Sequence, residues 1–400
     1  MTAALENPFR TAPGSLPPVF AGRDGELSAA RYATSLTASG GAAQPIVFTG
    51  LRGMGKTALL RQCVAEAEAR RGVVLYSEAS RENPLSSSLR RSLEHAKTRF
   101  RSIPRKIQTA LEAAIKSLPE ATYELPSDLG GIKLAPPSLA PRRESFVEAL
   151  ETLNAEVRRD HRFLLIAIDE LQEGHVKDLL VLVEFVHLTA GTSEPALFLG
   201  AGLPDTPRHL HAVRTYTERW RYFRIGLLTP PETALAVESP AQAQGVTFED
   251  AAVARIVEES AGYPFFVQEY ASAAWLQHRG KRVTLADVQA IAPGVRRILE
   301  DGFYDERFRR LTPRECRYAL AMAELGAGPH TVAEIAQSLG ATSETVSSIR
   351  NQLLKKDVVY VPSPGLVEFR MPLTERYVEQ HRAELARRAA LAAPGSASPE

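Results

Sequence analysis

A glycine-rich loop near the start of the chain constrains its fold more than any other feature. Residues 45–49 are mostly apolar, and residues 50–57 follow with the pattern G-x-x-x-x-G-K-T. Glycines permit backbone torsions that let successive N–H groups wrap a phosphate, while the lysine reaches phosphate oxygens and the threonine hydroxyl binds Mg²⁺. Helix formers follow the loop, so the required order of strand, loop and helix is predicted. The predicted ATP-binding residues of this loop are Gly50, Gly53, Gly55, Lys56, Thr57 and Ala58, with Thr57 also a Mg²⁺ ligand.

A second apolar run, residues 163–168, ends in the carboxylates Asp169 and Glu170. Such a run is typical of a central parallel strand covered on both faces, and ligands bind at the carboxyl ends of such strands. We predict that Asp169 holds Mg²⁺ through water and that Glu170 is catalytic, orienting or deprotonating the attacking water, with Lys56 as the second catalytic residue. The alternative is that the two acids merely end a buried strand in a solvated turn.

Composition limits the function classes. A chain of 400 residues with 44% hydrophobic residues is large enough for two or three domains with ordinary cores. Its formal charge of +1 excludes binding of polyanions by bulk charge, so any nucleic-acid surface has to be local. Two distant cysteines argue against a disulfide framework, and neither a signal peptide nor a membrane span is indicated. We expect a cytoplasmic protein without membrane association.

The pattern along the chain predicts an α/β domain with a parallel P-loop sheet, followed by a helical lid and a second helical unit. Strands are predicted near 45–49, 73–77, 163–168, 195–200 and 222–226, separated by helical patterns. Five helix-start signatures of the [S/T]-x-x-[D/E] type follow, at Thr229, Thr247, Thr284, Thr312 and Thr331, and a break between two helical groups is expected at 294–304. The predicted parts are an extended segment 1–19, a nucleotide-binding domain 20–228 with an insertion at about 81–145, a lid 229–300, a winged helix 301–382 and a disordered tail 383–400.

Several of these stretches together resemble a known group of proteins. They are 20–26 (FAGRDGE), 50–57, 169–172 (DELQ), 200–204 (GAGLP), 216–219 (YTER) and 262–268 (GYPFFVQ). The set resembles the AAA+/STAND-related P-loop ATPases of the origin-recognition-like, archaeal-ATPase type, found in bacteria as "ATP-binding proteins". The resemblance implies that Gly22 and Arg23 lie beside the adenine, although an ordinary helix-start turn is the alternative. It also implies a nucleotide contact at Pro264 and an arginine finger among Arg219, Arg221 and Arg224, with Arg219 as the first choice. The finger would act in a homo-oligomer that forms with ATP bound.

The chain departs from the group in two places. Residues 262–264 lack the lid arginine of initiator-type relatives, as in the G-x-P arrangement of STAND switches, and residues 200–204 offer no polar sensor at the end of the fourth strand. Both departures predict slow hydrolysis, with bound nucleotide holding one arrangement of domains.

The predicted winged helix has its recognition helix within 342–356, where Arg350 and Lys355 are candidates for contact with duplex DNA. A second candidate surface lies in the insertion, because residues 81–106 hold eight basic and two acidic side chains, among them Arg90 and Arg91. The alternatives are a winged helix that binds protein and a solvated basic helix surface.

Three functions remain open. The leading hypothesis is an AAA+-like ATPase regulator that couples its nucleotide state to association with duplex DNA. Its rival is a STAND-type signalling switch that acts on protein partners without nucleic acid. The third is a domain that binds ATP without hydrolysing it.

Overall fold

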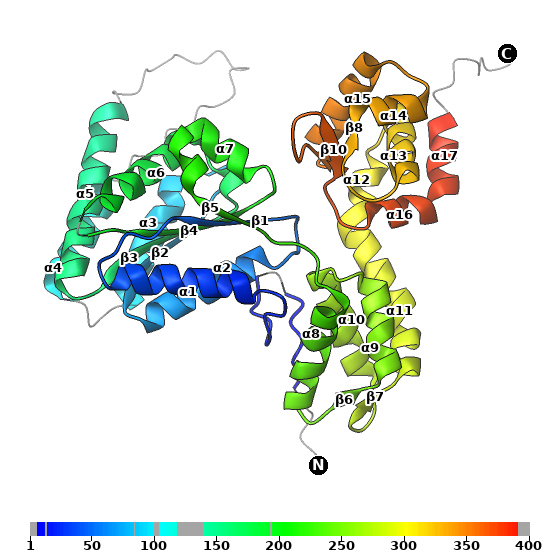
Figure 1. Cartoon of the computed structure of the whole chain (residues 1–400), viewed down its shortest axis with the longest axis horizontal. Coiled ribbons are helices and arrows are strands. Elements are labelled where there is room, and N and C mark those ends of the chain that lie inside the picture. The colour runs from blue at the N-terminus through cyan, green and yellow to red at the C-terminus, as the bar shows by residue number, and fades with distance from the viewer. Residues whose placement is uncertain are drawn as a thin grey trace.

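The structure, a computed structural model, describes residues 6–12, 14–83, 85–99, 104–117, 139–192 and 194–390. The chain forms three successive units: an α/β unit, a helical unit, and a C-terminal unit joined to the second by a long helix (Figure 1). The Pro-rich part of the predicted insertion, 118–138, and the end of the predicted tail, 391–400, lie outside the described residues.

A five-stranded sheet organises the first unit, and all of its strand pairs are parallel. The predicted fold class is confirmed, and each predicted strand is present with bounds shifted by at most two residues. The strand order places β4 between the strand that precedes the P-loop and the strand that ends in the two acids. The strands, in the sheet order β2-β3-β4-β1-β5, are β2 (Gly72–Glu78), β3 (Phe163–Asp169), β4 (Leu197–Gly202), β1 (Ile46–Thr49) and β5 (Arg221–Arg224).

Helices cover both faces of this sheet. Alternate residues of β3 divide between two hydrophobic clusters, with Leu165 facing one and Leu164 the other, so its wholly apolar sequence matches burial on both sides. α1 (Asp24–Ala38) and α2 (Lys56–Ala69) share the first cluster. The second cluster holds α3 (Leu85–Arg99), α4 (Arg105–Ser117), α5 (Leu139–Arg159), α6 (Val176–Ala190) and α7 (Thr206–Val213).

The insertion is therefore part of the core. Its long connection suggests a functional or mobile segment, yet Leu89, Leu93, Ile107 and Leu111 of α3 and α4 are almost fully buried. These helices therefore have a structural role that the sequence did not predict, because their apolar faces form the layer that covers β2 and β3.

The second unit is the predicted helical lid. Capping boxes start two of its helices at the predicted residues Thr229 and Thr284. The prediction at Thr247 is wrong: Thr247 lies in β6 (Thr247–Phe248), which pairs with β7 (Arg282–Val283), and Glu249 precedes the helix instead. The helices are α8 (Pro230–Ala243), α9 (Asp250–Ser260), α10 (Pro264–Gln277) and α11 (Leu285–Glu300).

The extended N-terminal segment is attached to the lid. Phe9 is 4% exposed and packs edge-on against Phe248 and Trp275, with ring centroids 6.0 and 6.1 Å away. The Asn7 side chain donates to the Ser272 hydroxyl at 2.9 Å. The segment thus packs against the lid before the chain enters α1.

A continuous helical path joins the second and third units. α11 passes without a break into a π-helical turn (Asp301–Asp305) and α12 (Glu306–Arg309). The break expected at 294–304 is therefore wrong. Val295, Leu299, Tyr304 and Phe308 are buried, and their packing outweighs the low helix propensity of the glycines.

The C-terminal unit has the elements of a winged helix. It has three helices and three short strands in the order helix, strand, helix, helix, strand, strand, and the strands pair antiparallel in the order β8-β10-β9. Capping boxes at Thr312 and Thr331 start two of the helices as predicted. The elements are α13 (Pro313–Leu325), β8 (His330–Thr331), α14 (Val332–Leu339), α15 (Ser343–Lys355), β9 (Val359–Tyr360) and β10 (Leu366–Phe369), followed by α16 (Thr374–Gln380) and α17 (Arg382–Ala390).

Helix α17 corrects the predicted tail. Residues 383–390 are expected to be disordered, but they form a helix whose Leu385 and Ala389 are buried in the core. This helix lies against α13 in Figure 1. Among the described residues, no helix has the length and apolar character that a membrane crossing requires.

Candidate nucleotide site

The P-loop joins β1 to α2 and has the backbone that a phosphate cradle needs. Gly53 and Gly55 have φ values of 73° and 84°, in the region that only glycine adopts readily. A Cβ atom at Gly50 would collide with the backbone carbonyl of Ile225. The glycines of the motif are therefore required by backbone torsion and by close approach.

Lys56 is the first residue of α2 and its side chain is buried. Its ammonium donates to the carbonyl of Leu51 at 2.8 Å, inside its own loop. Burial lowers the pKa of Lys56 to about 8, although the nearby carboxylates of Glu170 and Asp169 act in the opposite direction. An anionic phosphate in the loop would give this buried ammonium the partner it lacks.

Asp169 lies at the end of β3, close to the P-loop. Its carboxylate accepts hydrogen bonds from Thr57 and, at 3.3 Å, from the Tyr76 hydroxyl. Burial raises the pKa of Asp169, which the bond from Thr57 opposes. The structure thus brings together the hydroxyl and the carboxylate that the sequence predicts as Mg²⁺ ligands.

This pair fits Mg²⁺. The ion commonly binds one or two protein oxygens and completes its shell with water and substrate phosphates. In the described part of the chain, no group of three or more His, Cys, Asp and Glu residues is arranged to hold a metal. The donors present therefore suit an ion that arrives with a nucleotide better than one held by protein alone.

Glu170 follows with a left-handed backbone conformation, φ 51°, which is uncommon for a residue with a side chain. Its carboxylate accepts a hydrogen bond from the side-chain amide of Gln172. The oxygen of the same amide accepts from the backbone N–H of Leu203 at 2.8 Å, at the end of β4. Gln172 therefore ties the predicted catalytic acid to the neighbouring strand.

The lid reaches the P-loop through Tyr263, which is fully buried. The Tyr263 hydroxyl donates to the backbone carbonyl of Arg52, and a Cβ atom at Gly53 would collide with this phenol. Pro264, a predicted nucleotide-binding residue, begins α10 directly after it. A tyrosine thus occupies the stretch of the lid in which the sequence lacks an arginine.

The predicted adenine neighbours Gly22 and Arg23 lie beside the linker from β5 to the lid. The Arg23 guanidinium is buried and donates to the Gly226 carbonyl at 2.6 Å. Gly22 lies against the lid, because a Cβ atom there would overlap the carboxylate of Glu232 in α8. The N–H of Ile225 donates to the carbonyl of Thr49 at 2.6 Å, at the end of β1. Gly22 and Arg23 are therefore close to the start of the P-loop, at the junction with the lid.

The C-terminal unit also contacts the P-loop. Asp357, which follows α15, lies 3.9 Å from the Arg52 guanidinium. Its carboxylate is also 3.6 Å from Arg307 and 3.1 Å from Arg370. One aspartate therefore connects the P-loop, the helix that joins the units, and the end of β10.

The other predicted residues lie apart from this site. Arg219 is exposed just before β5, where Gln44 donates to its carbonyl at 3.3 Å, at the opposite end of the sheet from the P-loop. Ala58 is buried in the first turn of α2. The nucleic-acid candidates Arg90, Arg91 and Lys355 are exposed, and Arg350 is half-buried.

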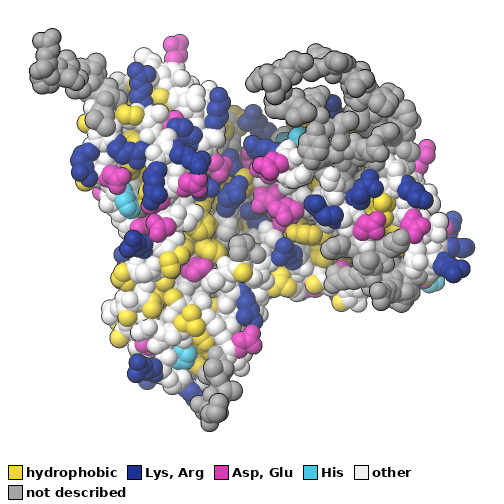
Figure 2. All heavy atoms as spheres, turned by 180° about the vertical axis from the view of Figure 1, so that it is seen from behind, with side chains coloured by type: hydrophobic (Ala, Val, Ile, Leu, Met, Phe, Trp, Pro, Cys, Tyr) yellow, Lys and Arg dark blue, Asp and Glu magenta, His cyan; other side chains and the backbone are white. Residues whose placement is uncertain are grey.

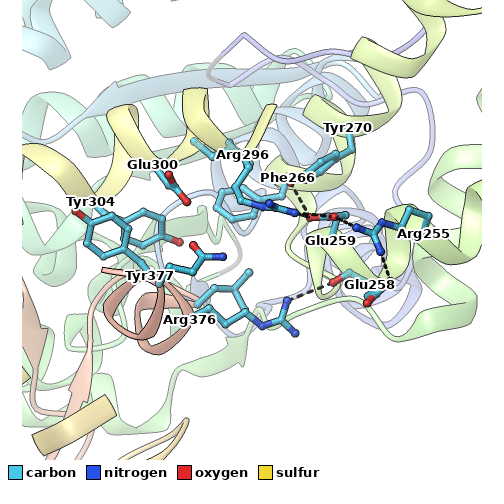
Figure 3. A pocket seen from close by; sticks show the side chains of 13 residues that line it. Arg255, Glu258, Glu259, Phe266, Tyr270, Arg296, Glu300, Tyr304, Arg376 and Tyr377 are labelled. Atoms are coloured by element: carbon cyan, nitrogen blue, oxygen red, sulfur yellow. Dashed lines mark hydrogen bonds and ion pairs between the residues drawn. The ribbon is translucent and has the colours of Figure 1, made fainter. Parts of the chain in front are cut away.

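A pocket of about 220 Å³ lies between the lid and the C-terminal unit (Figure 3). Arg255 and Arg296 both reach the carboxylate of Glu259, at 2.6 and 2.9 Å, while Arg376 donates to the backbone carbonyl of Glu258 at 3.3 Å. These ion pairs lie within the lid, inside α9 and between α9 and α11, so the hydrogen bond of Arg376 is the one of these contacts that joins the lid to the C-terminal unit.

Comparison with known families identifies the class of domain. Residues 19–199 match the model of the AAA ATPase domain, and residues 301–378 match a domain of unknown function (DUF8462). The first unit is thus similar in sequence to the AAA ATPase domain. No curated protein sequence matches it.

Three solved structures illustrate what the chain is similar to. The ORC1 protein of Aeropyrum pernix in complex with DNA has 17% identity and a TM-score of 0.47, over 94% of this chain and 97% of that one. Cdc6p of Pyrobaculum aerophilum has 14% identity and a TM-score of 0.45 over the same shares. The Holliday junction branch migration motor RuvB of Thermotoga maritima has 13% identity and a TM-score of 0.44, over 90% and 95%.

Sequence reasoning missed the roles of three residues at this site: Gln172, Tyr263 and Asp357. Gln172 and Tyr263 lie inside stretches that carry the family resemblance. The resemblance therefore indicates that these stretches matter, but it does not predict the contacts of the two side chains. No sequence pattern indicates a role for Asp357, because only the folding of the chain brings the end of α15 close to the P-loop.

Proposed function

We propose that this protein binds ATP with Mg²⁺ at the P-loop, hydrolyses it slowly, and couples its nucleotide state to association with duplex DNA through the winged helix. The observation that carries the coupling is that the P-loop contacts both other units, through Tyr263 and Asp357. A change at the phosphate site therefore has a direct route to the lid and to the C-terminal unit.

The residues divide the chemistry among them. Backbone N–H groups of the loop and the Lys56 ammonium bind the phosphates, and Thr57 and Asp169 hold the metal. Mg²⁺, when bound, neutralises phosphate charge during transfer. Glu170 orients the water and accepts its proton. Gly22, Arg23 and Pro264, at the junction with the lid, contact the nucleoside.

Slow turnover follows from what the site lacks. The lid presents Tyr263 in place of an arginine, so no lid cation reaches the γ-phosphate. We propose that Arg219 supplies the missing charge from a neighbouring copy. It lies too far from the P-loop of its own chain, because the whole length of β5 separates them. Hydrolysis would then rise with assembly.

The DNA surface is proposed on two places. Arg350 and Lys355 lie on α15, and Arg90 and Arg91 are exposed on α3. On one face of the C-terminal unit, Lys and Arg side chains are interspersed with Asp and Glu (Figure 2). DNA binding would therefore depend on particular basic residues and would weaken steeply with salt.

A STAND-type switch that acts on protein partners is the second candidate. The contact of Asp357 with Arg52 favours it, because this ion pair links the C-terminal unit directly to the P-loop. In this candidate the winged helix is released by nucleotide exchange and binds no nucleic acid.

The test is steady-state ATP hydrolysis by the full chain at two protein concentrations, with and without duplex DNA, beside Glu170→Gln. Stimulation by DNA and by concentration, lost in Glu170→Gln, supports the DNA-associated ATPase. The variants Arg350→Glu/Lys355→Glu and Arg90→Glu/Arg91→Glu then identify the surface. Turnover that DNA leaves unchanged favours the switch, and turnover equal to that of Glu170→Gln leaves a domain that only binds ATP.

A further inference from the structure

The end of β4 carries no polar side chain of its own. Its last residues and the turn that follows are Gly200, Ala201, Gly202 and Leu203. β4 lies between β1 and β3, so this end is adjacent to both the P-loop and the two acids. A polar group here would be next to the reacting phosphate.

Gln172 supplies a polar group at this place from a different element. Its side chain is 8% exposed and belongs to the short turn Leu171–Glu173 after β3. The amide oxygen accepts from the Leu203 N–H at 2.8 Å and lies 3.5 Å from the Thr206 hydroxyl. Because these donors fix the oxygen, the amide nitrogen is directed to the carboxylate of Glu170.

The Gln172 side-chain amide packs closely against Gly202 of β4. A Cβ atom at Gly202 would collide with the Thr206 side chain and would lie 2.8 Å from the Gln172 oxygen. The absence of a side chain on β4 thus leaves the space that the Gln172 amide occupies.

Glu170 directly follows Asp169, whose carboxylate accepts a hydrogen bond from Thr57 of the P-loop. A carboxylate near the P-loop lysine repels the phosphates of ATP, so it needs a fixed donor to hold it in place when the nucleotide binds. The amide of Gln172 is such a donor.

We propose that Gln172 is a positioning residue for ATP hydrolysis: its amide bridges the Leu203 N–H and the Glu170 carboxylate, and so holds the catalytic acid in the orientation that activates water. This inference rests on the proposed ATPase function. It assigns to the turn after β3 the polar group that β4 lacks.

Two substitutions separate positioning from structural support. Gln172→Ala removes both hydrogen bonds. Gln172→Glu keeps an oxygen that accepts from Leu203, but its carboxylate repels Glu170 instead of donating to it, so the support is kept and the positioning is removed. Gln62→Ala is the matched control, because Gln62 donates to Glu66 at 2.9 Å on α2, within the same domain.

The experiment measures kcat, the KM for ATP, the Kd of a fluorescent ATP analogue and the melting temperature for each variant, alone and combined with Glu170→Gln. We expect kcat to fall by about 10-fold or more in both Gln172 variants, with ATP affinity changed by less than about threefold. In the Glu170→Gln background, replacing Gln172 should change kcat by less than about twofold, because Gln172 acts through Glu170.

Three results would overturn the inference. One is kcat at the wild-type level in Gln172→Glu, and another is an equal loss of kcat with and without Glu170. The third, Glu170→Gln hydrolysing as fast as wild type, refutes the proposed catalytic role as well, whereas the first two leave it intact. If Gln172→Ala does not fold, Gln172→Glu decides between these results.

Discussion

The hydroxyl of Tyr263 donates a hydrogen bond to the backbone carbonyl of Arg52 and so fastens the lid to the P-loop. The two residues are 211 positions apart in the chain. The Tyr263 ring also packs against Phe266 in an edge-on arrangement, with centroids 4.3 Å apart, so the phenol is held from the lid side as well. The lid and the P-loop are therefore joined directly at this contact.

Removing this hydroxyl should loosen the lid. Tyr263→Phe keeps the buried ring and deletes the hydrogen bond, so the free energy of unfolding should fall by about 1 kcal/mol in urea titrations. Hydrogen exchange of the amides at 52–55 should quicken. Tyr318→Phe is the control, because the Tyr318 hydroxyl is buried without a hydrogen-bond partner among the described residues, and its removal should cost almost nothing. Equal losses in the two variants would contradict the role given to Tyr263.

Neutralising Asp357 should open the C-terminal unit. Asp357→Asn keeps a residue type that tolerates its positive φ of 60° but removes the charge that faces Arg52, Arg307 and Arg370. We expect a larger radius of gyration in small-angle scattering without nucleotide, and faster proteolysis between the units. The control is Asp250→Asn, an exposed aspartate at the start of α9. A radius of gyration unchanged from wild type would refute the idea that the ion pairs of Asp357 hold the C-terminal unit against the P-loop.

Acid should weaken the C-terminal unit through Glu315. Burial opposes the ionisation of this carboxyl, but the ion pair with Lys356 at 2.6 Å and the bonds from Thr312 outweigh it and hold its pKa below the usual range. A lowered folded-state pKa means that the unfolded chain binds more protons, so this stability is full above about pH 4.3 and is lost as pH falls further.

Comparing Glu315→Gln with wild type checks this. At pH 7 the variant should be less stable by about 1–3 kcal/mol, because Lys356 loses its charged partner. The difference in the free energy of unfolding between wild type and variant should shrink from pH 5 to pH 3, because protonation of Glu315 removes the same charge that the substitution removes. A difference that stays constant over this interval would contradict the assignment.

Neither cysteine should react in the native protein. Burial raises the pKa of Cys63 to about 12 and also raises that of Cys316, so almost no thiolate is present at pH 8. Titration with a disulfide reagent at pH 8 should find no rapidly reacting thiol, and both thiols after unfolding in urea. One fast thiol in the native protein would show that α2 or α13 opens readily.

Local sequence was sufficient to predict secondary structure wherever a backbone preference or a contact between residues close in sequence decides it. The apolar runs predicted all five strands of the sheet, and four of five [S/T]-x-x-[D/E] signatures are capping boxes. The fifth failed at Thr247 because its N–H pairs with the Lys281 carbonyl, 34 residues away, which makes this stretch a strand. A cap is encoded within four residues, whereas a strand partner is not.

The candidate site shows the same division. Lys56, Thr57, Asp169 and Glu170 were predictable, because a P-loop and a strand ending in acids carry their chemistry in consecutive residues. The residues that contact this group from other parts of the chain were not predictable. Gln172 is directed by a backbone N–H on β4, and Tyr263 and Asp357 reach the P-loop from the lid and the C-terminal unit.

The P-loop, the acidic strand, the parallel sheet and the mainly helical character of the lid and the C-terminal unit follow from local sequence. The folded chain was needed to show that α3 and α4 cover the sheet, that one helical path runs through residue 300, and that residues 383–390 form a helix. The difference lies in the range of the forces involved. Backbone preferences and hydrophobic periodicity act over a few residues, while burial and ion pairing depend on which distant segments the folded chain brings together.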